Sequence, residues 1–301
     1  MKKNLKKITK SLLDRFGYRV VRLDRPVKIK ISIPPSYGTL TAFKKKNKTL
    51  LFNANIKDGR GTPLWGLGIP SYHPFVIAAR AWLTNEGSEK YKASIVREIL
   101  NQYYALVAPK DVSQLFDLYS HRQELCSLPV YSTVMPWWSS DPYSRMSKVE
   151  ETTMRENERS GRRIGIEFGW PWVGPAMVEK ISIEGDRLIR ITESISRFGY
   201  KRHNGLEGDL LVDILVNADD DWVWQVKSGQ HRACALAALG FGNIPVRCGQ
   251  IIHRNEVAIW PNVQRGIYNI DEALNIFDNS FSGALPAFAS GWTSFVDELG
   301  L

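Results

Sequence analysis

Residues 210–252 constrain the fold more than any other stretch of the chain. Two short segments alternate in strand fashion, LLVDILV at 210–216 and WVWQV at 222–226, and the turn residues NADD separate them. This pattern predicts a β-hairpin. An Ala/Leu-rich helix is expected to begin at about His231 and to be capped by Gly240, and NIPVRCGQII at 243–252 predicts a further strand. Together, strands and helix predict an α/β (α+β) fold.

The composition allows a sizeable packed core. The chain has 301 residues, enough for one large domain or two ordinary ones, and 44% of them are hydrophobic. These values exclude disorder, a collagen repeat and a small disulfide scaffold for most of the chain. Three cysteines without a CxxC pair and five histidines without HxxH spacing favour neither a disulfide framework nor a metal site. A reducing, cytoplasmic location is expected, because no signal peptide or bilayer-length apolar run is present.

Positive charge is concentrated at the N-terminus. Residues 1–48 contain 15 Lys and Arg but only Asp14 and Asp24, a net charge of +13. The other 253 residues have 25 Lys and Arg against 29 Asp and Glu, a net charge of −4. A mildly acidic body is unsuited to wrapping nucleic acid. The asymmetry instead predicts a basic arm that meets a polyanion.

Within this arm, residues 3–17 have helical spacing and a lysine-rich polar face. The apolar stripe consists of Leu5, Ile8, Leu12 and Phe16. Two interpretations stay open: residues 1–16 lie on the anionic inner face of a membrane, or the stripe packs on its own domain. Nucleic acid is the less favoured partner because it gains little from a continuous aliphatic stripe.

Periodicity outlines further elements along the chain. Strands are predicted within 18–32 and 49–56, a Gly/Pro-rich loop at 59–72, and helices at 74–83, 90–107, 112–118 and 186–198. Residues 145–163, the most polar stretch, predict either a solvated helix or a mobile linker. The expected divisions are a basic helix and lead-in (1–25), an α+β region (26–145), a polar linker (146–164), an α/β domain (165–255) and a short irregular tail packed on the body (256–301).

The junction between the strand ending at Ser228 and the next helix is a candidate phosphate site. Unpaired N–H groups in the first turn of a helix attract anions, and Gly229 lets the backbone approach closely. His231 and Arg232 add side-chain donors there. The plainer interpretation is a tight turn with both side chains on the surface, because one glycine before a helix is a weak signal.

The segment VKSGQHRACALAALGFGNIPV resembles the signature of the ParB/sulfiredoxin-like superfamily. Members share a strand, a G-x-x-R turn, an Ala-rich helix, a glycine and a strand that begins Ile-Pro-Val. The resemblance covers residues 165–255 and implies a nucleotide- or phosphate-binding α/β fold. The whole chain also resembles uncharacterised bacterial proteins with this domain that occur with surface-polysaccharide genes.

The superfamily implies three activities, and the residues present choose among them. Sulfiredoxins repair a sulfinic acid with ATP through a reactive cysteine. Gln230 stands at the position of that cysteine, so this chain lacks the thiolate that the reaction requires. Chromosome-partitioning ParB proteins bind CTP and DNA and need a helix-turn-helix domain. Only 46 residues follow Asn255, without a recognition-helix pattern. A small-molecule kinase or a catalytically silent nucleotide-binding module remains.

The resemblance to the kinases implies a phosphate clamp and a carboxylate base. The clamp corresponds to Ser228, Gly229, Gln230, His231 and Arg232. Arg187 is expected to be a second phosphate contact. Ser228 stands where those kinases have Asp, which leaves open whether this chain is active. A glutamate ahead of the long helix acts on the substrate hydroxyl in the kinases, and Glu179 and Glu184 are the candidates. For either one, an acid stabilised by the helix dipole is the plainer interpretation.

Residues and resemblance together predict a nucleotide-binding protein that transfers phosphate from ATP or another nucleotide, with Mg²⁺, to a small hydroxyl substrate in envelope-polysaccharide metabolism. The alternative is a non-enzymatic, nucleotide-gated binding protein associated with DNA. A closed pocket with a carboxylate near the γ-phosphate would favour the kinase. A long basic cleft across the nucleotide site would favour the alternative.

Overall fold

The computed structural model describes residues 51–62, 65–118, 122–200 and 209–300. The helix predicted at 3–17 and the strands predicted within 18–32 lie outside this part of the chain. The described residues form a mixed α/β structure with a five-stranded sheet. Its strands are β1 (Leu51–Asn55), β2 (Gly59–Arg60), β3 (Leu210–Val216), β4 (Trp222–Ser228) and β5 (Asn243–His253).

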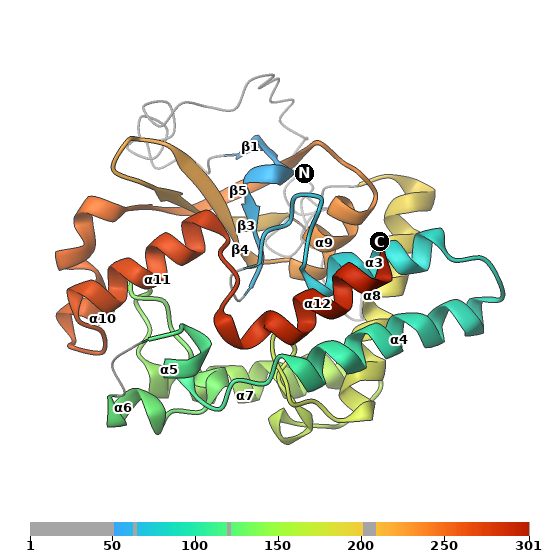
Figure 1. Ribbon diagram of the computed structural model, residues 1–301, viewed down its shortest axis with the longest axis horizontal. Coiled ribbons are helices and arrows are strands. Elements are labelled where there is room, and N and C mark those ends of the chain that lie inside the picture. Colours follow the sequence, from blue (N-terminus) through green and yellow to red (C-terminus); the bar gives the residue numbers. More distant parts are fainter. Residues whose placement is uncertain (1–50, 63–64, 119–121, 201–208, 301) are drawn as a thin grey trace, which may run out of the picture.

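Helices surround this sheet. The longer ones are α3 (Pro74–Thr84), α4 (Glu89–Leu106), α7 (Pro142–Arg159), α8 (Val178–Phe198), α9 (Gln230–Ala238), α11 (Ile270–Ser282) and α12 (Ser290–Leu299). Shorter ones are α5 (Val112–Leu115), α6 (Gln123–Cys126) and α10 (Pro261–Gln264), with 3-10 turns at Ile56–Asp58, Val130–Ser132, Ile166–Phe168, Arg254–Ile259 and Ala287–Ala289. In Figure 1 the sheet lies in the upper part, α10 and α11 lie at one end, α8 lies at the other, and α4 and α7 run below.

The strand order is β1-β5-β3-β4-β2. Strands β3 and β4 pair antiparallel, which confirms the hairpin predicted from the alternation at 210–226. Strand β5 pairs parallel to β3 after the α9 crossover and also binds β1 antiparallel. The predicted strand at 243–252 is therefore confirmed, and it lies inside the sheet rather than at an edge.

The sheet is strongly curled. Strands β1 and β2 lie at opposite edges, yet only Ile56–Asp58 separates them in sequence. Four strand spacings in a flat sheet span about 19 Å, whereas four residue steps reach at most about 14 Å. The two edges must therefore bend toward each other. The rings of Phe52 on β1 and Trp222 on β4 accordingly lie 5.8 Å apart.

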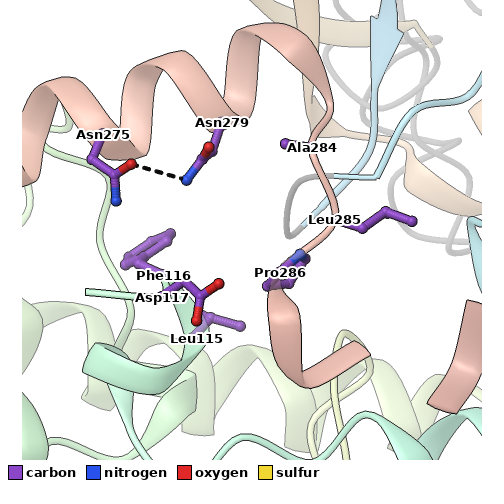
Figure 2. Close-up of a pocket in the computed structure, with 8 residues that line it drawn as sticks. All are labelled: Leu115, Phe116, Asp117, Asn275, Asn279, Ala284, Leu285 and Pro286. Atoms are coloured by element: carbon purple, nitrogen blue, oxygen red, sulfur yellow. Dashed lines mark hydrogen bonds between the residues drawn. The ribbon is translucent and has the colours of Figure 1, made fainter. Parts of the chain in front are cut away.

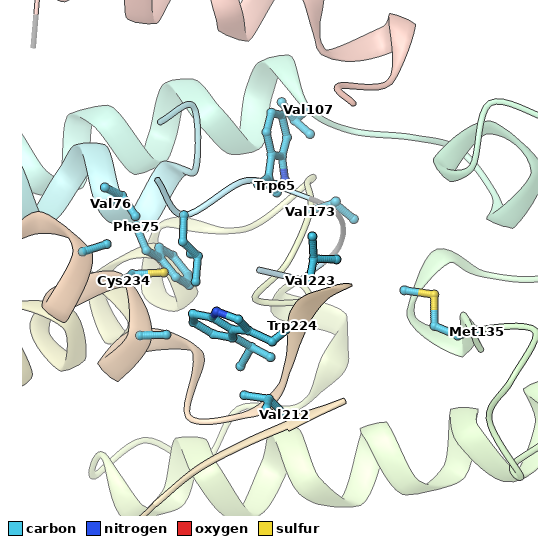
Figure 3. Close-up of a cluster of buried hydrophobic side chains, with 14 of the residues drawn as sticks. Trp65, Phe75, Val76, Val107, Met135, Val173, Val212, Val223, Trp224 and Cys234 are labelled. Carbon is cyan, nitrogen blue, oxygen red and sulfur yellow. The ribbon is translucent and has the colours of Figure 1, made fainter. Parts of the chain in front are cut away.

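Trp224 fills the concave side of the curl. Its Nε1 donates a hydrogen bond of 2.7 Å to the Asn55 carbonyl, and its ring lies so close to Gly59 that a Cβ there would clash with it. Figure 3 shows Trp224 close to Val212 of β3, Phe75 of α3 and Cys234 of α9. All four are buried, so α3 and α9 close the sheet on this side and form one continuous core with it.

The long helix α8 begins earlier than its sequence predicts. Glu179 and Glu184 were expected ahead of a helix at 186–198, but both lie within Val178–Phe198. Gly185 obscured this continuity, because glycine lowers helix propensity. The glycine is buried against α4: a Cβ there would meet side-chain atoms of Arg97 at 3.4 Å and Val96 at 3.6 Å. Tertiary packing thus explains a residue that local propensity counts as a helix breaker.

Of the two alternatives for the polar stretch the structure confirms the helix, and the tail is more ordered than predicted. Most of the polar stretch 145–163 belongs to α7, and Val149, Thr153 and Asn157 on one face of that helix are buried. The predicted irregular tail is largely helical, because Asn269 and Glu272 form a reciprocal capping box that starts α11. Trp292 of α12 is fully buried, so the tail does pack on the body. Among the described helices, none has the length and apolar character needed to cross a bilayer.

Candidate functional site

The turn between β4 and α9 has the backbone of an anion site. Gly229 adopts a left-handed conformation with φ 95°, and a Cβ there would lie 2.7 Å from Leu210 Cδ2. No side chain caps α9. Among the described residues, no hydrogen bond takes up the backbone N–H groups of Gln230 and His231. These two groups can therefore donate to a ligand, and the helix dipole favours a negative one.

The other turn residues differ in accessibility. Ser228 is exposed, and Arg232 is half-buried beside Tyr200, whose pKa is raised by burial and lowered in part by Arg232. Both side chains therefore lie at the outer side of the turn. His231 and Gln230 are instead largely buried, and each enters a separate polar cluster.

His231 belongs to an ionic cluster centred on Glu184, which is 0% exposed. The Glu184 carboxylate accepts hydrogen bonds from Lys180 at 2.7 Å and from Arg187 at 3.1 Å. The Nε2 atom of His231 lies 2.7 Å from Oε2 of Glu184, a distance typical of an ion pair, although the N–H is not aligned as in a hydrogen bond. The structure thus brings three of the predicted site residues, Glu184, Arg187 and His231, into contact with one another.

The surroundings of this cluster hold it rigidly. Lys180, 1% exposed, also donates to Asn157 of α7 at 2.9 Å, and the His231 ring stacks on Phe75 of α3 at 4.6 Å. Burial alone would raise the pKa of Glu184, but His231, Lys180 and Arg187 outweigh it and hold that pKa below its ordinary range. A buried carboxylate that is already paired with Lys180 and Arg187 is a poor base, so Glu184 positions His231 instead of reaching a substrate.

Gln230 enters the second cluster. Its side-chain oxygen accepts from the Thr62 amide at 3.1 Å, and its Nε2 contacts His73. His73 Nδ1 in turn accepts from the Phe75 amide and caps α3. Burial, reinforced by the charge of His231, lowers the pKa of His73 to about 3, so this ring is neutral near pH 7. Gln230 therefore links α9 to α3 and does not face a ligand.

No family model matches this chain. Neither the curated proteins nor the solved structures contain a significant match.

Glu179 lies apart from the residues around Glu184. It precedes Glu184 by five positions of α8, which corresponds to about 7.5 Å along the helix and about 140° around it. Its side chain is half-buried, and the first turn of α8 holds it where the helix dipole favours an acid. Of the two carboxylates predicted from the sequence, one is enclosed by cations and the other lies on a different face of the helix.

Asp213, the most unusual carboxylate near the turn, is not among the residues predicted from the sequence. It lies on β3, is 2% exposed, and accepts from Lys227 at 3.2 Å and Gln250 at 3.0 Å. Burial raises its pKa, and these two partners lower it only in part. An acid within the apolar run LLVDILV was the available signal, because burying a charge is costly unless it is paired.

Irregular strand pairing on both sides of β3 brings the partners of Asp213 to its carboxylate. Opposite Leu211 and Val212, β4 has Ser228 and Val226, so Lys227 is an extra residue. Opposite Asp213, β5 has the two residues Gly249 and Gln250. Bulges redirect side chains and are frequent beside active sites. Here they bring Lys227 and Gln250 into contact with Asp213. Lys227 precedes Gly229 by two positions, so this cluster adjoins the turn.

A separate hollow of about 140 Å³ lies between the end of α5, the helix α11 and the 284–286 loop. Figure 2 shows Asn275 and Asn279 reaching into it from α11 and Asp117 facing them from the other side. None of the turn residues lines it. The backbone of Asp117 is in the left-handed region, with φ 55°. Its carboxylate accepts a hydrogen bond of 3.0 Å from the Ala287 amide, so this residue joins the tail to the body.

Proposed function

We propose that this chain binds a nucleotide or another phosphorylated ligand at the turn between β4 and α9. The observation that carries this proposal is the left-handed Gly229 followed by a helix without a side-chain cap. The backbone N–H groups of Gln230 and His231, at the start of α9, are not used within the helix and can donate to phosphate oxygens. Arg232 and Ser228, at the outer side of the same turn, supply further donors.

The ionic cluster supports this proposal indirectly. His231 is the second residue of α9, and its contacts with Glu184 and Phe75 anchor the first turn of that helix. An anchored turn presents its N–H groups in one geometry, which reduces the entropy that ligand binding costs. Arg187, predicted as a second phosphate contact, is already paired with Glu184 at 3.1 Å and with Glu156 at 3.8 Å.

Replacing Arg232 tests the binding site. In Arg232→Ala we expect nucleotide affinity to fall by about 10- to 100-fold, the effect of losing one charge-assisted contact of roughly 1.5–3 kcal/mol. Calorimetry with ATP, ADP and CTP, with and without Mg²⁺, measures this affinity. Arg155→Ala on the exposed side of α7 removes the same charge and should leave it unchanged. Equal affinities for a folded Arg232→Ala protein and the native protein would refute the site.

Phosphoryl transfer to a small hydroxyl substrate is a second candidate, and Asp213 is the observation that favours it. A buried acid with a raised pKa beside a phosphate site is typical of proton-transfer groups. Lys227, held by this acid, would place a positive charge beside the transferred phosphate. Without turnover, the same turn would serve a non-enzymatic nucleotide-gated protein.

Asp213→Asn separates the two candidates. The amide keeps the shape and the contact with Gln250 but removes the negative charge that holds Lys227. For a phosphotransferase we expect turnover to fall by at least about 100-fold, which is within the usual range for loss of a general base. Nucleotide affinity should change by less than about threefold. Glu179→Gln should leave both quantities unchanged. If no hydroxyl acceptor of any class is phosphorylated by the native protein, the binding function alone remains.

A further inference from the structure

A second hollow, of about 340 Å³, lies where the end of α7 meets the middle of α8. Its lining consists of Ser160, Arg162, Ile183, Asp186 and Arg190. Positions 183, 186 and 190 repeat at helical spacing, so one face of α8 forms one wall. Ser160 and Arg162, just beyond the last turn of α7, form the opposite wall. The volume is within the range of small-molecule sites.

Positive charge predominates around this hollow. Arg162 and Arg190 are exposed, and within the described ranges neither forms an ion pair. The single acid of the lining, Asp186, is already paired with Arg97 at 2.6 Å. Two guanidinium groups thus face a common space without an anionic partner of their own, an arrangement that attracts an anion.

A third guanidinium, that of Arg187, contacts a residue of the lining. Arg187 donates to Ser160 Oγ at 3.3 Å, and its side chain retains 16% exposure. Its other terminal nitrogen binds the buried Glu184 and lies 3.8 Å from the carboxylate of the half-exposed Glu156, so this guanidinium is fixed in place before any ligand arrives. A fixed arginine flanked by two free ones matches the several oxygens of a phosphate or sulfate group, which accept paired hydrogen bonds.

We propose that this hollow binds a small molecule carrying a phosphate or sulfate group, through Arg162, Arg190 and Arg187. The site is distinct from the β4–α9 turn and does not depend on the function proposed for it. The two are nevertheless connected, because Arg187 and His231 share the Glu184 carboxylate. An anion bound to Arg187 competes with Glu184 for the charge of that guanidinium, and so it changes the electrostatic surroundings of His231, which anchors α9.

The test uses the full chain with Arg232→Ala, so that phosphate binding at the turn does not contribute. Inorganic phosphate and pyrophosphate are titrated by calorimetry, with sodium chloride at matched ionic strength as reference. We expect saturable binding that falls by about 10-fold or more in Arg162→Gln and again in Arg190→Gln, the loss of one charge-assisted contact each. Arg155→Gln, an equal change of charge on exposed α7 outside the lining, should bind as before.

The imidazole resonances of His231 provide a second readout. We expect them to shift on adding pyrophosphate and to stay in place with chloride, because Arg187 and His231 contact the same carboxylate. Binding that persists in the Arg162→Gln, Arg190→Gln double variant would overturn the proposal. So would a response to chloride equal to the response to phosphate, since that would reflect screening of surface charge alone.

Discussion

At the scale of single residues, Glu184 shows how burial changes what a carboxylate can do. It is completely enclosed, and its partners Lys180, Arg187 and His231 come from two helices. Removing one member of a buried ionic group leaves the other charges buried and unpaired. The resulting loss of stability exceeds the net stability that the intact group contributes. The residue therefore links α8 to α9 and holds the anchor of the candidate phosphate turn.

Replacing this residue should affect stability before activity. We expect Glu184→Gln to lower the free energy of unfolding by about 3–5 kcal/mol at pH 7, the cost of unpairing buried charges. Glu179→Gln, the same change at a half-buried position of the same helix, should stay within about 0.5 kcal/mol. Urea denaturation of the three proteins measures both values, and equal losses in the two variants would contradict the assigned roles.

The same residue predicts the direction of one pH effect. The pKa of Glu184 is lower in the folded protein than in the unfolded chain, so the unfolded state binds the proton more tightly. The stabilisation it contributes is therefore present above the unfolded pKa of about 4.3 and is lost as the pH falls through the folded value. Repeating the denaturation below pH 4.5 should show a smaller difference between native and Glu184→Gln proteins than at pH 7.

At the scale of elements, the crossing of α4 and α8 depends on a small residue at position 185, which is Gly185. The position is helical, and the nearest atoms around a Cβ would be side chains at 3.4–3.8 Å, an ordinary contact distance. Alanine therefore fits without moving α4, whereas a larger side chain does not.

We accordingly expect Gly185→Ala to stabilise the protein by about 0.5–1 kcal/mol, because alanine has the higher helix propensity. Gly185→Leu should destabilise it by about 1–3 kcal/mol through overpacking. Thermal denaturation followed by circular dichroism distinguishes the two. A loss of stability in the alanine variant would show that the two helices pack more tightly than these contacts indicate.

At the scale of the whole molecule, charge is divided between a basic N-terminal segment and a mildly acidic body. Residues 1–48 lie outside the described part of the chain, so the sequence alone carries this point. The combination of a cationic face and an aliphatic stripe at 3–17 suits an anionic interface, where each basic residue contributes about 1 kcal/mol.

We therefore expect weak binding of the full chain to anionic but not neutral vesicles, decreasing between 20 and about 200 mM salt as screening increases. A cosedimentation assay measures it, and a protein lacking residues 1–16 should no longer bind. Binding to duplex DNA without binding to vesicles would instead assign the segment to nucleic acid. Insolubility of the shortened protein would show that the stripe packs on its own domain.

Sequence alone determined the local elements of this protein. The β3–β4 hairpin, the turn at Gly229, helix α9 and strand β5 follow from periodicity and turn chemistry, which act between near neighbours. The grouping of Glu184 and Arg187 with His231 came from a resemblance, and the structure brings these three side chains together. The resemblance implied that Arg187 contacts phosphate and that Glu184 is a free base. It did not indicate that Glu184 is buried or that the two side chains pair with each other.

Only the tertiary structure decided how these elements meet. Periodicity reports which face of an element is apolar but not which element covers it, so the insertion of β5 between β1 and β3 and the curl around Trp224 were not predictable. The same holds for Asp213, whose partners reach it through irregular pairing in two neighbouring strands. Contacts between distant residues depend on the packing of the whole core, because each buried charge needs partners that only the folded chain brings within reach.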